Sequence, residues 1–143
     1  QVVARFLKSE DFLLVSPNSY NALGLGLSQL YNTTWVYNHK RKGTFKLNGK
    51  TFEFKIKSTI PKTISREYLL VDLLNNLDNL AEDQAAALNK LPEHIPSHFD
   101  PDALMQATQQ YGTGKTKRIL KSIIRKALHV QASWVYRQII VYL

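Results

Sequence analysis

Two runs of alternating apolar and polar residues flank the dipeptide Asn48-Gly49. The apolar positions of these runs are Phe45 and Leu47 before the dipeptide and Phe52, Phe54 and Ile56 after it. Alternation with a period of two is typical of a strand that buries one face. Asn-Gly supplies the two positive φ angles of a type I′ turn, which joins strands through only two residues. The sequence therefore predicts a β-hairpin centred on Asn48-Gly49.

Three shorter elements precede this hairpin. Residues 12–15 form a compact apolar run closed by Ser-Pro-Asn, which favours a buried strand, although so short a run does not exclude a helix. Residues 20–25 predict at most a short helix, because Gly24 and Gly26 each cost a helix about 1 kcal/mol relative to Ala. Residues 33–37 are β-branched and aromatic, as strands are.

The order of these elements resembles the antitoxins of AbiE-type abortive-infection systems, bacterial partners of nucleotidyltransferase toxins. The features that carry the resemblance, over about residues 1–90, are Pro17, Ala22 to Leu25, Trp35-Val36-Tyr37, the basic turn Lys40-Arg41-Lys42, and Asn48-Gly49. The resemblance implies a non-catalytic antitoxin that neutralises such a toxin in phage defence. Family members usually carry an N-terminal winged helix that binds their own promoter, and the residues before Phe12 are too few to hold one.

The period of the apolar residues changes to that of a helix at Ser65, which is the predicted N-cap, with Glu67 in the favourable first turn. Residues 82–91 predict a second helix or a continuation of the first, ended by Pro92, with a linker near 92–99. A chain of 143 residues fits a single domain. The predicted fold class is α/β (α+β), with a small, mainly antiparallel sheet from residues 1–60 covered by helices from residues 65–143.

A pair of helices is predicted after the linker. Asp100-Pro101-Asp102 is a strong helix start, Gly112 ends that helix, and a second, basic helix follows at once. The short turn between them fits a DNA-binding helix-turn-helix. The alternative, which we favour, is an αα-hairpin whose second helix is half core and half basic surface. The tail over 130–143 suits either helix or strand.

The formal net charge of +8 is unevenly distributed. Residues 36–66 hold nine basic side chains against Glu53, residues 67–111 hold eight acids against Lys90, and residues 112–143 hold seven bases and no acid. The basic blocks either dock on the acidic one or leave a positive surface for nucleic acid. The candidate nucleic-acid-binding or partner-binding residues are Lys40, Arg41, Lys42, Lys115, Lys117, Arg118, Lys121 and Arg125.

Those residues suggest a second class of function, a stand-alone nucleic-acid-binding module or transcriptional regulator. Trp35 and Tyr37, behind the basic turn, either stack on bases or pack in the core. The interpretation as a binding module competes with that as an antitoxin, whose partner is a nucleotidyltransferase toxin.

Little in the sequence predicts an enzyme, a metal or a cofactor. The chain has no cysteine, which excludes disulfides and thiol chemistry. The segment from Tyr111 to Thr116 lacks the first glycine and the preceding strand of a phosphate-binding loop, so a helix end followed by a helix start is expected. Pro96 lies between His94 and His98, so we expect exposed loop histidines rather than ligands. With no membrane span or signal peptide expected, the predicted location is the bacterial cytoplasm.

Overall fold

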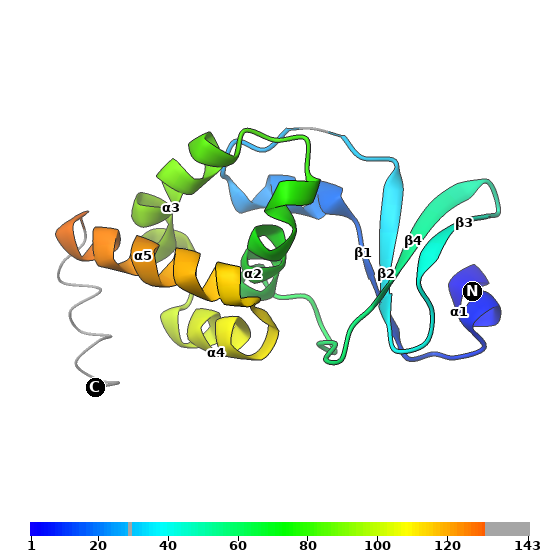
Figure 1. Cartoon of the computed structure of the whole chain (residues 1–143). Coiled ribbons are helices and arrows are strands. Elements are labelled where there is room, and N and C mark those ends of the chain that lie inside the picture. The colour runs from blue at the N-terminus through cyan, green and yellow to red at the C-terminus, as the bar shows by residue number, and fades with distance from the viewer. Residues whose placement is uncertain (29, 131–143) are drawn as a thin grey trace. The chain divides into compact units, whose positions relative to one another are not determined.

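The computed structural model describes residues 1–28 and 30–130, with side chains as far as Ile123. The chain divides into two compact units (Figure 1). The first comprises Gln1–Ala22 and Ser28–Ile64, and the second comprises Leu23–Leu27 and the residues from Ser65 onward. The sheet lies in the N-terminal half and most of the helix in the C-terminal half, which confirms the predicted α+β class.

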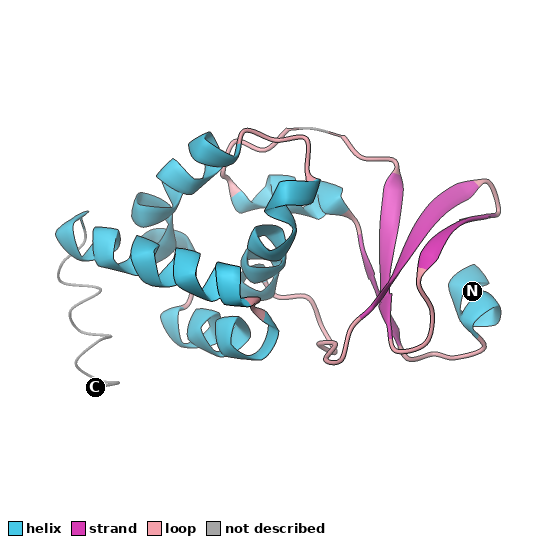
Figure 2. Ribbon diagram, in the orientation of Figure 1, coloured by secondary structure: helices cyan, strands magenta, loops and turns pink. Residues whose placement is uncertain are grey.

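The first unit is built on four strands: β1 (Phe12–Val15), β2 (Thr33–Asn38), β3 (Gly43–Leu47) and β4 (Lys50–Ile56). Their order across the sheet is β1-β2-β4-β3, shown in magenta in Figure 2. β1 is antiparallel to β2 and β3 to β4, whereas β2 and β4 run parallel. The predictions of a mainly antiparallel sheet and of a strand over 12–15 are therefore confirmed.

The predicted hairpin is present, with its turn at Asn48-Gly49. Asn48 has φ 52° and Gly49 has φ 76°, the two positive values that a type I′ turn requires. Leu47 pairs with Lys50, so the two strands are joined by two residues only.

A short helix, α1 (Val2–Leu7), covers one face of this sheet. Its buried residues Val3 and Leu7 pack against Val36, Phe52 and Phe54. The helix ends at Lys8, which adopts a left-handed conformation with φ 55°. The opposite parity of β2 places Trp35 and Tyr37 on the other face of the sheet, where Tyr20 packs within 6.2 Å of the Trp35 ring. Tyr20 belongs to η1 (Pro17–Leu23), a 3-10 helix where the sequence predicted at most a short helix.

The second unit is helical: α2 (Arg66–Asn76), η2 (Leu77–Asn79), α3 (Gln84–His98), α4 (Pro101–Tyr111) and α5 (Gly114–Val130). The side chains of Ser65 and Asp100 cap α2 and α4 as predicted, by accepting hydrogen bonds from Tyr68 N and Ala103 N. α4 packs chiefly on α2, and α5 chiefly on α3. The predicted tail over 130–143 lies outside the described residues from 131 onward.

The linker predicted near 92–99 is wrong, because α3 continues through Pro92 and Pro96 to His98. A proline inside a helix removes a backbone hydrogen bond and clashes with the preceding turn, at a cost of about 3 kcal/mol. The burial of the helix offsets this cost, because Leu91 and Ile95 are 1% and 0% exposed and lie on one face with Ala87. Packing therefore overrides the local preference that the prediction used.

The segment Leu23–Leu27 belongs to this helical unit. Its three leucines are buried, and the two glycines between them have positive φ angles of 77° and 78°. A Cβ atom on Gly24 would lie 2.8 Å from Nε2 of His94, so a side chain there would collide with α3. The glycines thus permit both the backbone conformation and the close approach of α3.

Candidate functional site

The basic turn between β2 and β3 is built around one buried side chain, Asn38, at the end of β2. Asn38 is 0% exposed, and its Oδ1 accepts hydrogen bonds from the backbone N–H groups of Lys40 (2.8 Å) and Arg41 (2.7 Å). Its Nδ2 donates to the carbonyl oxygen of Arg41 at 3.0 Å. An asparagine that mimics a backbone turn in this way fixes the residues that follow it. The backbone carrying the predicted cations is therefore preorganised.

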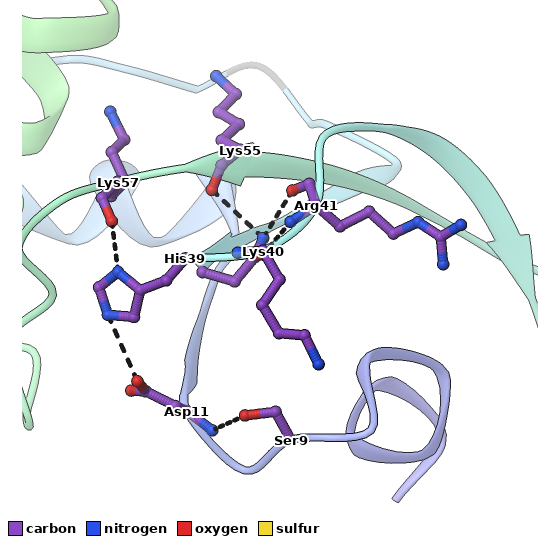
Figure 3. A network of polar contacts seen from close by, with 8 residues as sticks. Ser9, Asp11, His39, Lys40, Arg41, Lys55 and Lys57 are labelled. Carbon is purple, nitrogen blue, oxygen red and sulfur yellow. Dashed lines mark hydrogen bonds and ion pairs between the residues drawn. The ribbon is translucent and has the colours of Figure 1, made fainter.

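His39 ties the same turn to the end of β4 and to the segment before β1 (Figure 3). Its Nδ1 lies 2.7 Å from the carbonyl oxygen of Lys57, so Nδ1 carries the proton of this hydrogen bond. Its Nε2 lies 3.4 Å from Oδ2 of Asp11. His39 thus joins the turn to the residue that follows β4, and its ring lies beside the Asp11 carboxylate.

The three predicted cations of the turn have different roles. Nζ of Lys40 donates to the carbonyl oxygen of Leu7 at 2.8 Å, at the end of α1. The guanidinium of Arg41 lies over the rings of Phe6 (4.6 Å) and Phe45 (5.1 Å). Lys42 is exposed and has no hydrogen bond or ion pair within the part of the chain that the structure describes. Two of the three predicted binding residues therefore hold α1 in place, and Lys42 is the one left for a partner.

Two further lysines, which the sequence prediction missed, are Lys55 on β4 and Lys57 directly after it. Nζ of Lys55 is 3.9 Å from the centre of the Trp35 ring, and Nζ of Lys57 is 4.9 Å from that of Tyr37. Trp35 is 5% and Tyr37 1% exposed, so both rings are packed in the core and are not accessible for stacking on bases. The sequence did contain a signal for this placement. Side chains along β4 alternate between its two faces, and the alternation, continued by one residue, puts Lys55 and Lys57 on the face opposite Phe54.

The second predicted basic site begins at the turn between α4 and α5, and this turn also depends on one asparagine. Nδ2 of Asn75, on α2, donates to the carbonyl oxygen of Tyr111 at 2.9 Å. Its Oδ1 accepts from the N–H of Thr113 at 3.0 Å. Oγ1 of Thr113 accepts from the N–H of Thr116 at 3.2 Å and so caps α5. The expected helix end and helix start over 111–116 are confirmed.

The cations of α5 lie apart from its buried positions, as both the helix-turn-helix and the αα-hairpin interpretations expect. Thr116, Leu120 and Ile123 are buried, whereas Lys115, Lys117, Arg118 and Lys121 are exposed. Lys115 forms an ion pair with Asp78, and its hydrogen bond and charge lower the pKa of that carboxyl. Helical geometry places Lys117, Arg118 and Lys121 in one stripe, the α5 cation stripe. Arg125 lies on α5 as well, but its side chain is outside the described residues.

Two groups with shifted pKa values, Tyr68 and His94, lie in packed parts of the helical unit. Burial, with the neighbouring Asp72 carboxyl, raises the pKa of Tyr68, whose hydroxyl donates to Oδ1 of Asp72 at 3.5 Å. His94, expected in a loop, lies on α3 and stacks on His98 with ring centres 3.8 Å apart. Its Nε2 hydrogen-bonds the carbonyl oxygen of Leu23 at 3.0 Å, and desolvation, then His98, lowers its pKa.

Among the side chains that the structure describes, which end at Ile123, no group of three His, Cys, Asp or Glu is placed to hold a metal, so no third ligand joins His94 and His98 there. Within residues 1–28 and 30–130, no helix is long and apolar enough to cross a membrane. Comparisons with protein-family models, with curated proteins and with solved structures found no match for this chain.

Proposed function

We propose that this chain is the antitoxin of a bacterial toxin–antitoxin pair and neutralises a nucleotidyltransferase toxin without catalysing a reaction. The observation that carries this proposal is the order of elements over residues 12–57, which resembles AbiE-type antitoxins. In the structure these elements are β1, η1, β2 and the β3–β4 hairpin, and the four strands among them form one sheet. Because such a toxin acts inside the cell, the proposal places the chain in the cytoplasm.

Charge supports an anionic partner for the first unit. Its residues, Gln1–Ala22 and Ser28–Ile64, include ten basic and three acidic side chains, a net charge of +7 out of +8 for the chain. A field of this strength attracts an acidic surface and raises its rate of association. Within the preorganised turn, Lys42 is the group best placed to contact it.

Co-expression with an AbiE-type nucleotidyltransferase toxin tests the proposal, with growth of the host as the measurement. The intact chain should restore growth, and Lys42→Glu should weaken the rescue. Lys62→Glu is the matched control, because Lys62 is an exposed cation of the connector between the units. Failure of the intact, folded chain to restore growth would show that it is not this toxin's antitoxin.

One observation favours a second candidate function, a nucleic-acid-binding regulator. The α5 cation stripe of Lys117, Arg118 and Lys121 stands on a helix whose start is held by Asn75. If the stripe contacts phosphates, replacing all three residues with Gln should reduce the slope of log affinity against log salt by up to about three. Lys115→Gln is the control, because Asp78 already pairs with Lys115 and the slope should change less. Equal slopes for the intact chain and the triple variant, measured with a duplex DNA probe, would show that the α5 cation stripe does not contact phosphates.

A further inference from the structure

Strand β3 has one edge on which no described strand pairs, since the sheet order ends at β3. Leu47 and Lys50 flank a two-residue turn, so they form a hydrogen-bonded pair, and pairs of this kind recur at every second residue. Gly43 and Phe45 therefore bond inward to β4, and the backbone groups of Thr44 and Lys46 point to the free edge. Among the described residues, no backbone group outside the sheet bonds to either of them.

The side chains of this edge alternate in chemistry as well as in direction. Thr44 and Lys46 share one face of β3 and are exposed, and Lys42, also exposed, directly precedes the strand. On the other face, Phe45 and Leu47 are partly buried against the cluster around α1. The edge thus presents an exposed cation at Lys46 and another just before the strand, at Lys42, with apolar surface on the face of Phe45 and Leu47.

Lysines on an edge strand protect it from pairing with its own kind. Two copies of β3 laid edge to edge would bring two rows of lysines together, and like charges at that spacing are destabilising. The same lysines attract a strand of opposite charge. Charge therefore argues against a second copy of this chain and for an acidic partner.

We infer that β3 binds an extended acidic segment of a partner protein, which adds to the sheet as a fifth strand. The backbone groups of Thr44 and Lys46 supply the hydrogen bonds of such an addition. Acidic residues of the partner lie beside Lys42 and Lys46, and apolar residues lie beside Phe45 and Leu47. This inference concerns the sheet edge and does not depend on the antitoxin function.

The probe for a test is a fluorescent peptide of alternating Glu and Val, seven residues long with blocked ends, titrated into the full chain. Binding should weaken as salt is added, because the attracting charges are exposed. Two versions of the peptide carry N-methyl groups on alternate residues. One version should lose binding at least about tenfold and the other should retain it, because only one set of N–H groups faces β3. Equal binding of both versions would overturn the inference.

A variant of the protein tests the same contact from the other side. Thr44→Pro removes an N–H that points to the free edge, so the ladder to β4 survives and the unfolding midpoint should stay close to that of the intact chain. Affinity for the peptide should fall at least about tenfold. A variant in which Lys42 and Lys46 are replaced with Glu should bind a Lys-Val peptide of equal length more tightly than the Glu-Val peptide. Unchanged affinity in Thr44→Pro, or no binding to the intact chain up to about 1 mM, would show that β3 does not accept a strand.

Discussion

The β2–β3 turn and the start of α5 look alike in sequence, since each is a cluster of cations after a polar turn, but the structure uses them differently. At the β2–β3 turn, Lys40 and Arg41 hold α1 through a carbonyl oxygen and two aromatic rings. On α5, Lys115 pairs with Asp78, and the α5 cation stripe is exposed. Charge density along a sequence therefore does not tell whether cations serve the fold or face outward.

Each of these two turns is also held by an asparagine, and here too the two differ. Asn38 lies at the end of its own strand and is fully buried. Asn75 reaches from α2 to a turn 36 to 38 residues away and is only partly buried. A hydrogen bond inside the protein is costly to lose because water does not replace the missing partner. The two asparagines should therefore differ in their contribution to stability.

The largest effect is expected for Asn38→Ala, which leaves the N–H groups of Lys40 and Arg41 without their acceptor. We expect it to lower the free energy of unfolding by about 2–4 kcal/mol. Asn75→Ala should cost less, about 1 kcal/mol, because water reaches its partners. Urea denaturation followed by circular dichroism measures both. Equal losses would remove the distinction between a buried and a solvent-accessible anchor.

Glycines of the two units give the next largest contrast. Gly49→Val should destabilise the chain by more than about 1 kcal/mol, because a β-branched residue resists the positive φ of the type I′ turn. Gly49→Asn should cost less, since asparagine tolerates this conformation. Gly114→Ala, at the start of α5, should be neutral or should stabilise by up to about 1 kcal/mol, because alanine favours a helix. An unchanged denaturation midpoint in Gly49→Val would contradict the role of the turn.

The hairpin and the helix caps could be predicted because their causes are local. The type I′ turn depends only on the φ angles of Asn48 and Gly49 themselves. Ser65 and Asp100 accept hydrogen bonds from residues only three positions further along the chain. The course of α3 could not be predicted, because Pro92 and Pro96 argue locally for a break. The burial of Leu91 and Ile95, which outweighs that preference, is visible only in the folded unit.

The candidate sites were predicted as residues but not as roles. The sequence identified Lys40, Arg41 and Lys42 together, yet it contained no sign that Lys40 would reach the end of α1, 33 residues earlier. Asn38 was overlooked, although an asparagine directly before a basic turn is a signal for a side chain that bonds its own backbone. Lys55 and Lys57 were missed because their aromatic partners lie on another strand.

A pH titration of stability should reveal a smaller effect that belongs to the helical unit. The pKa of His94 is below its usual value because of desolvation, then His98, with Arg66 and Lys90 adding to the effect and the Leu23 carbonyl opposing it. A histidine whose pKa is lower in the folded state stabilises fully above the unfolded pKa of about 6.5, and that stability falls as the pH drops below it. His94→Gln should flatten the stability profile between pH 7 and 5, measured by urea midpoints; an unchanged slope would assign it to other groups.

The smallest effect on stability, and the sharpest contrast between the two basic regions, is expected from charge removal. Replacing Lys117, Arg118 and Lys121 with Gln should change the free energy of unfolding by less than about 0.5 kcal/mol. A slight gain is the more natural sign, because cations near a helix N-terminus oppose its dipole. The same replacement at Lys40, Arg41 and Lys42 should cost about 1–2 kcal/mol, through the lost hydrogen bond to Leu7 and the lost cation–π contacts. Measuring the thermal midpoint of each triple variant together with its growth rescue distinguishes an effect on stability from an effect on function. If the α5 variant fails to restore growth while its thermal midpoint is unchanged, the α5 cation stripe is a working surface of the antitoxin. If its midpoint instead falls as far as that of the turn variant, the stripe supports the fold, and the contrast drawn between the two regions is wrong.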